Sequence, residues 1–137
     1  MPTISCDIVC PTKHLASVEA YMVVVPGSEG SLGFLPGHEP LLTPLKSGVV
    51  SLQDKAGSLL EQFVVQGGYA EIAQSKLIIL ADRAANVKDL DKASLEAHLS
   101  ELQAKHTSQQ ELDSHDAQSY ELTESWIKLC LEYCYLA

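Results

Sequence analysis

Three polar residues of this sequence carry side chains suited to proton transfer. His38 and Glu39 are adjacent, and Asp82 follows farther along the chain. An imidazole and two carboxylates can serve as an acid–base set. The sequence contains no serine or cysteine elbow and no H-E-x-x-H motif. We therefore interpret these groups as surface or interface residues, place Asp82 at a domain junction beside Arg83, and expect no catalytic residue.

The glycine-rich segment 27–37, GSEGSLGFLPG, invites comparison with a phosphate-binding loop. Such a loop ends in G-K-[ST], whose lysine meets the phosphates, and opens a helix. This segment lacks that ending and precedes sequence typical of β-strands. Its glycines are better explained as turn positions that need a positive φ angle.

The four cysteines form two pairs, Cys6 with Cys10 and Cys130 with Cys134. Zinc sites use tighter C-x-x-C spacing with further ligands nearby, so no metal site is predicted. The first twenty residues show no basic start followed by an apolar block, which predicts no secretory signal. Free, buried structural thiols are expected, and no cofactor is.

Charge and hydropathy exclude further classes of partner. The formal net charge is −9, and Arg83 is the sole arginine among nine basic residues. Nucleic-acid binding needs clustered Lys and Arg, so no nucleic-acid partner is expected. No apolar run approaches the ~18 residues of a membrane helix, so membrane association is expected only through a protein partner.

Glycine and proline divide the chain into two segments. All eight glycines lie at or before Gly68 and all six prolines at or before Pro44. Because these residues interrupt regular elements, the first segment predicts short strands and the second predicts helices. Residues 3–10 alternate apolar and polar, and four further runs are apolar and β-branched, at 21–25, 49–52, 59–65 and 76–80. Turns are expected at 26–27, 36–37, 54–57 and 67–68.

The second segment has a helical period. Asp89 or Asp91 can cap a first helix, in which Leu95, Leu99 and Leu102 form one apolar stripe. The polar stretch 107–110 interrupts it, and a second helix starts either at a Ser108–Glu111 capping box or at Ser114. Its seam is expected to contain Leu122, Trp126, Leu129, Tyr133 and Leu136. A β-sandwich followed by an αα-hairpin results, with the boundary at 84–88.

Three blocks of the sequence resemble the epsilon subunits of F-type ATP synthases. They are VVPGSEGSLGFLPGHEPLLTPLKSGVV at 24–50, FVVQGGYAEI at 63–72 and LIILADRAANVKDLD at 77–91. The resemblance covers residues 1–91, and beyond them only the helix–loop–helix layout matches. It implies a ten-stranded antiparallel β-sandwich over 1–86 and a two-helix antiparallel hairpin over 87–137.

The resemblance also implies a function and partners. Epsilon is a non-catalytic central-stalk subunit that binds the gamma subunit and the c ring, and so couples proton-driven rotation to ATP synthesis. In bacteria its hairpin can extend along gamma, approach the alpha and beta subunits and inhibit ATP hydrolysis. The implied location is peripheral, on the cytoplasmic side of the cell membrane.

Individual positions follow from this resemblance. Glu29, Gly30 and Ser31 would face the c ring, where many relatives carry a carboxylate at the position of Ser31. The residues expected to face gamma are Cys10, His38 and Thr43. The residues expected to carry regulation by the second helix are Trp126, Leu129 and Tyr133.

The hairpin departs from relatives that sense ATP. Those carry [IL]-D-x-x-R-A at the first helix, where this chain keeps Asp91 but has Ser94 and Leu95 in place of the arginine and alanine. The second helix contains no arginine, and residues 88–137 hold ten acidic and four basic side chains, a net charge of −6. Asp91 is thus only a remnant of the ATP motif, and negligible ATP binding is expected.

Three hypotheses for the function of the chain come from different classes of protein. A structural coupling subunit is the leading one, and co-purification with gamma would support it. A nucleotide-sensing module is the alternative, and nucleotide-dependent protection of the hairpin would support that. An enzyme ranks third, because no reactive set of residues is visible, and turnover by the isolated chain would be needed to support it.

Overall fold

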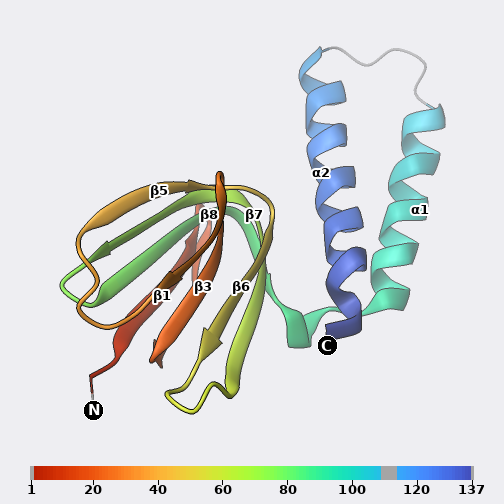
Figure 1. Ribbon diagram of the computed structural model, residues 1–137. Coiled ribbons are helices and arrows are strands. Elements are labelled where there is room, and N and C mark those ends of the chain that lie inside the picture. The colour runs from red at the N-terminus through yellow and green to blue at the C-terminus, as the bar shows by residue number, and fades with distance from the viewer. Residues whose placement is uncertain (1, 109–113, 137) are drawn as a thin grey trace. The chain divides into compact units, whose positions relative to one another are not determined.

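The structure is a computed structural model that describes residues 2–108 and 114–136, with side chains at 2–105 and 120–136. The chain divides into two compact units, Met1–Val87 and Lys88–Ala137. In the first unit the structure describes eight strands (Figure 1). They are β1 (Ile4–Cys10), β2 (Lys13–Ala20), β3 (Met22–Gly27), β4 (Gly30–Phe34), β5 (Leu41–Leu45), β6 (Gly48–Gln53), β7 (Leu59–Ala73) and β8 (Lys76–Asn86).

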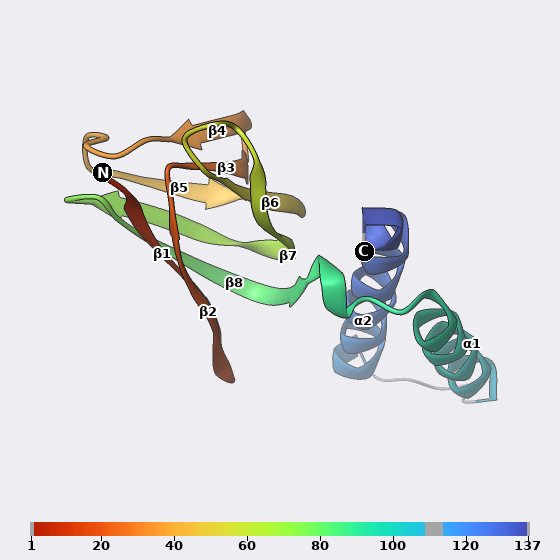
Figure 2. The ribbon, with the colours of Figure 1, turned by 90° about the horizontal axis from the view of Figure 1, so that it is seen from below.

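The strands pair in the order β2-β1-β8-β7-β5-β3-β4, with β6 pairing β3 and β7. All neighbours are antiparallel except β1 and β8. Strands β5 and β6 pair with successive parts of β7, because Leu45 opposes Gly68 and Gly48 opposes Val65. The paired strands curl into a sandwich that encloses one core (Figure 2).

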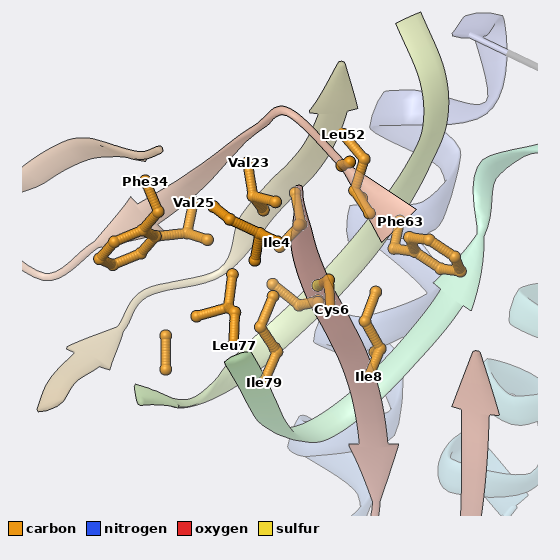
Figure 3. Packing of buried hydrophobic residues seen from close by; sticks show 14 of the residues in the cluster. Ile4, Cys6, Ile8, Val23, Val25, Phe34, Leu52, Phe63, Leu77 and Ile79 are labelled. Carbon is orange, nitrogen blue, oxygen red and sulfur yellow. The ribbon is translucent and has the colours of Figure 1, made fainter. Parts of the chain in front are cut away.

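The alternation predicted for residues 3–10 is confirmed by β1. Ile4, Cys6 and Ile8 are fully buried, and the residues between them are partly exposed. Figure 3 shows these three side chains directed at residues from β3, β6, β7 and β8. Because alternate residues of a strand point to opposite faces, one face of β1 is committed to the core and the other lies outside it.

The longest strand changes its inward face partway along. In β7 the core residues are Phe63 and Val65 before Gly67–Gly68, and Ala70 and Ile72 after it. The two glycines have φ angles of +67° and +117°, values that residues with a side chain rarely adopt. A Cβ at Gly68 would lie 2.0 Å from the carbonyl oxygen of Leu80. These glycines therefore bend the strand rather than end it.

The structure corrects two predicted turns and does not confirm the predicted strand count. Residues 67–68 lie inside β7, and residues 26–27 lie inside β3, whose hairpin turn comes two residues later. The turns at 36–37 and 54–57 are confirmed. The expected count of ten strands is not confirmed, because β7 and β8 each continue through the bend as one strand.

The second unit contains two helices that pack against each other as an antiparallel hairpin (Figure 1). After a 3₁₀ turn, η1 (Val87–Asp89), helix α1 spans Lys92–Ser108 and α2 spans Ser114–Tyr133, followed by η2 (Cys134–Leu136). Asp91 is the N-cap of α1: its Oδ1 accepts a hydrogen bond from the backbone N–H of Ala93 at 3.2 Å. Of the two predicted caps, Asp91 is therefore the one used.

The apolar stripe predicted on α1 is confirmed, since Leu95, Leu99 and Leu102 are its partly buried residues among those whose side chains are described. The predicted seam of α2 needs correction. Ile127 and Cys130 are its buried residues, at 1% exposure each, whereas Leu122 is 52% exposed. The buried line is shifted by one residue from the predicted one, because steps of three and four residues allow two adjacent lines on a helix.

One expectation concerns residues between the helices. Helix α2 is described from Ser114, one of the two predicted starts. Of the alternative, a Ser108–Glu111 capping box, Glu111 lies outside the described residues, as do residues 109–110 of the polar stretch 107–110. Residues 107–108, predicted to interrupt the helix, lie in the last turn of α1. Of the helices in the described ranges, none is long and apolar enough to cross a membrane.

The bend in β7 predicts a sharp contrast between two glycine substitutions. Gly68→Ala should destabilise the sandwich by at least about 2 kcal/mol, because the new methyl group meets backbone at an unfavourable φ. Gly33→Ala in β4 should change stability by less than about 0.5 kcal/mol, because its Cβ would lie 3.8 Å from the Met22 sulfur. Urea unfolding of the full chain, followed by circular dichroism, measures both. Equal effects would contradict the role given to the bend.

Candidate partner-binding surfaces

The hairpin that joins β3 to β4 carries the residues predicted to face a ring of partner subunits. Its two-residue turn is Ser28–Glu29, and Ser31 pairs with Pro26 across the hairpin. Glu29 and Ser31 are exposed, and Gly30 has a φ of +135°. The backbone N–H of Ser28 donates to the carbonyl of Pro44 at 3.1 Å, which ties the tip to β5. The tip is therefore a short, braced projection.

A cleft of about 530 Å³ lies beside this tip. It is lined by residues 28–32 and 41–44, so it brings Thr43 to the same site as Glu29, Gly30 and Ser31. Among the described residues that line it, Glu29 is the one ionisable side chain. Thr43 opposes the buried Ala70, and its neighbours Leu42 and Pro44 are exposed. Its contact with gamma, implied by the resemblance, stays a prediction.

A row of apolar residues crosses the outer face of the sheet. Pro44 of β5 opposes Tyr69 of β7, Tyr69 opposes Leu80 of β8, and Leu80 opposes Val9 of β1. We call these four residues the transverse row. Tyr69 is 54% exposed and Leu80 50%. Adjoining exposed apolar side chains of this kind are typical of protein interaction surfaces.

Cys10 lies at one end of the transverse row. It lines a second cleft, of about 380 Å³, together with Val9, Tyr69 and Leu80 of the row, and with neighbouring residues Pro11, Gly68, Ala81 and Asp82. All four cysteines are free. Burial raises the pKa of Cys6 to about 12 and that of Cys130 to about 11, and it raises the pKa of Cys10 as well. These thiols stay protonated at neutral pH. The prediction of buried thiols is confirmed for Cys6 and Cys130, whereas Cys10 and Cys134 are only partly buried.

His38 lies in the loop between β4 and β5. Its ring meets the ring of the buried Phe34 edge-on, with centroids 5.0 Å apart. Its Nδ1 lies 2.7 Å from the carbonyl oxygen of Glu39. Asp82, the third member of the imagined acid–base set, lies instead at the bend, where a Cβ on Gly67 would approach its Oδ2 to 2.8 Å.

No site for metal chemistry emerges from the described residues, which contain no cluster of three His, Cys, Asp or Glu side chains able to hold an ion. Asp91 is also engaged: besides capping α1, its Oδ2 accepts a hydrogen bond from the Ser94 hydroxyl at 2.8 Å. The residue that replaces the motif's arginine thus bonds to the carboxylate of the same motif.

Glu124 is the centre of a polar network in the helical hairpin. Its carboxylate accepts a hydrogen bond from the Tyr120 hydroxyl and one from Lys128 Nζ at 3.0 Å. Gln103 of α1 donates to it from the facing helix. These interactions, the Tyr120 bond foremost, hold the pKa of Glu124 below its ordinary value. Lys128 is therefore engaged within the hairpin.

The transverse row and the Glu124 network were missed from the sequence. One feature of the sequence does indicate the transverse row. Residues 77–80 are all apolar, whereas a strand with one buried face would alternate apolar and polar residues. The Glu124–Lys128 spacing is a second signal, because residues four apart on a helix are neighbours. Nothing in the sequence indicates that Gln103 meets Glu124.

Comparison with known proteins identifies the relatives of this architecture. Residues 3–87 match the family model described as the ATP synthase delta/epsilon chain, β-sandwich domain. An ATP synthase epsilon chain from Chelativorans sp. (strain BNC1) is 40% identical over 102 residues, which cover 74% of this chain and 75% of the relative. One from Granulibacter bethesdensis is 36% identical over 113 residues, covering 82% and 83%.

Two solved structures share the fold. A chain in the Euglena gracilis mitochondrial ATP synthase, OSCP/F1/c-ring, superposes with a TM-score of 0.61 at 21% identity, covering 98% of this chain and 79% of that one. A chain in the Tetrahymena thermophila mitochondrial ATP synthase central stalk and c ring gives 0.57 at 17% identity, covering 96% of both.

The lowered pKa of Glu124 predicts how the hairpin responds to acid. A carboxyl whose pKa falls on folding stabilises the fold above its unfolded pKa of about 4.3, and this contribution is lost as pH falls through the lower folded pKa. Glu124→Gln should weaken the helical hairpin at neutral pH and flatten its acid dependence, as measured by helical circular dichroism on titration. Glu121→Gln, at an exposed position of α2, is the control and should behave as wild type. Identical acid titrations for Glu124→Gln and wild type would count against the network.

Proposed function

The chain belongs to the family of ATP synthase epsilon chains, non-catalytic subunits of the central stalk, and we propose that its two units divide the work of that subunit. The sandwich, residues 1–86, binds the gamma subunit and the c ring, and the hairpin, residues 87–137, regulates ATP hydrolysis. The observation that carries the proposal is the transverse row: an exposed apolar surface on a sandwich of this family. The subunit would lie peripherally, on the cytoplasmic side of the cell membrane.

The transverse row is the proposed centre of the gamma interface. Tyr69 and Leu80 offer adjoining apolar area, and aromatic residues at the centre of an interface often dominate its affinity. Cys10 lines the cleft beside them. His38 and Thr43 complete the gamma-facing set from the β4–β5 loop and from β5.

The β3–β4 tip is the proposed contact with the c ring. Glu29, Gly30 and Ser31 project together and border the cleft that also contains Thr43. Where many relatives carry a carboxylate, Ser31 offers a hydroxyl, so Glu29 supplies the negative charge at this tip. The backbone bond to β5 and the two-residue turn keep the tip stiff, as the transmission of torque requires.

The hairpin is proposed to inhibit ATP hydrolysis through apolar contacts with the alpha and beta subunits. Trp126, Leu129 and Tyr133 are partly buried in the described hairpin and would supply that area. Lys128 is paired with Glu124, and the exposed Glu121 and Glu132 would oppose approach to acidic loops. Nucleotide sensing is not favoured, because Asp91 is engaged as a helix cap.

The gamma interface is tested with a matched pair of leucines. Leu80→Ser should weaken binding of purified gamma by about tenfold or more, the loss expected for one central apolar contact. Leu59→Ser is the control: Leu59 is 53% exposed on β7, close to the 50% of Leu80, but lies outside the transverse row. Titration calorimetry measures both affinities after thermal melts confirm folding. Equal binding by the two variants would place gamma on another surface.

Inhibition by the hairpin is tested in the reconstituted complex. Trp126→Ala should relieve inhibition of ATP hydrolysis, because burying this ring contributes on the order of a few kcal/mol. Lys128→Ala should leave inhibition unchanged or stronger at low salt, since it removes only a charge already paired. Hydrolysis rates across salt concentrations decide between them. The hydrophobic account is wrong if Lys128→Ala abolishes inhibition while Trp126→Ala preserves it.

A further inference from the structure

The turn between β7 and β8 holds two residues in an unfavourable conformation. Gln74 and Ser75 have φ angles of +53° and +59°, and they are the positive-φ residues other than glycine in the described chain. A two-residue hairpin turn with both φ angles positive is the type I′ geometry, for which Asn-Gly is strongly preferred. A residue with a Cβ costs free energy at such an angle. A strained backbone conformation of this kind persists where contacts with the surrounding structure hold it in place, often at functional sites.

Ser75 makes two long-range contacts from this turn. Its carbonyl oxygen accepts a hydrogen bond from the backbone N–H of Ser5 at 3.0 Å. Its side-chain Oγ accepts one from the backbone N–H of Gly37 at 2.9 Å. The carbonyl contact would survive any substitution, because it is made by backbone. The contact to Gly37 requires a hydroxyl at this position, and so it can explain why serine is present where glycine would relieve strain.

Gly37 belongs to the loop that carries His38. Within the loop, the backbone N–H of His38 donates a hydrogen bond to the carbonyl oxygen of Leu35 at 3.1 Å. Gly37 has a φ angle of +83°. The His38 ring rests against Phe34 at the end of β4. These contacts all lie within residues 34–39. The bond from Gly37 to Ser75 spans 38 residues and anchors the loop to the β7–β8 turn.

We propose that Ser75 is a positioning residue for the gamma interface: its hydroxyl anchors the His38 loop in the conformation that binds gamma, and the strained turn is kept for that purpose. The inference rests on the proposed function, in which His38 faces gamma. A loop anchored before binding loses less conformational freedom on binding, so the anchor raises affinity without touching the partner.

Two variants separate turn strain from anchoring. Gln74→Asn relieves strain at the first turn position and leaves the Ser75 hydroxyl in place. The double variant Gln74→Asn, Ser75→Gly creates the preferred turn sequence and removes the hydroxyl. We expect both variants to unfold at higher temperature than wild type. We expect only the double variant to bind gamma more weakly, by about three- to tenfold, the range for one hydrogen bond.

Hydrogen exchange at the Gly37 amide supplies a readout of the anchor itself. The full chain with Gln74→Asn should protect this amide as wild type does, and the double variant should exchange it faster. The proposal is overturned if the double variant binds gamma as tightly as wild type, or if its Gly37 amide stays protected. Failure of the proposed function looks different, because wild type and both variants would then all fail to bind gamma.

Discussion

The change of inward face at Gly67–Gly68 is the constraint on which the sandwich depends. Strands β7 and β8 keep a single register along their whole paired length. The side chains that face the core nevertheless change from odd-numbered to even-numbered residues, between Val65 and Ala70 in β7 and between Ala81 and Ala84 in β8. One strand pair can therefore line both parts of the core. Strands β5 and β6 follow the opposite edge of β7 across the same bend. Backbone without a Cβ makes this possible, because the carbonyl of Leu80 occupies the space that a side chain at Gly68 would need.

The proposed binding surfaces follow from the same geometry. Tyr69 and Leu80 stand next to the bend with their side chains on the outer face, and Gly68 lines the cleft that contains Cys10. A strand that must bury alternate residues on one side presents the others in register on the opposite side. The surface proposed for gamma is thus supported directly by the core, and a rigid sheet beneath it suits a subunit that transmits torque.

The sequence predicts the parts of this architecture that depend on local pattern. The alternation in β1, the Asp91 cap and the leucine stripe of α1 follow from periods of 2 and 3.6 residues, and all three are confirmed. It fails where a residue's role depends on a distant strand. Glycines 67–68 resemble a turn until their pairing partners are known, and β2, β4 and β5 have weak alternation of their own. The transverse row arises from the register of four strands, which no local window contains. The residues assigned to gamma and the c ring from the resemblance remain predictions.

The two units differ in how tightly their sequences specify one state. The sandwich commits residues from all eight strands to a continuous core, so local changes are opposed by many neighbours. Among its side chains that the structure describes, helix α1 contributes three partly buried leucines, and Gln103 of α1 bonds to Glu124 of α2. The exposed ion pair between Lys128 and Glu124 contributes little. In the proposed function, a partner that offers apolar surface to Trp126 shifts the hairpin toward an open arrangement only by as much as its affinity differs between the two arrangements. In the proposed function, one short segment serves as a folded appendage in one state and as an inhibitor in another, because the apolar side chains partly buried in the hairpin are the ones proposed to contact the alpha and beta subunits.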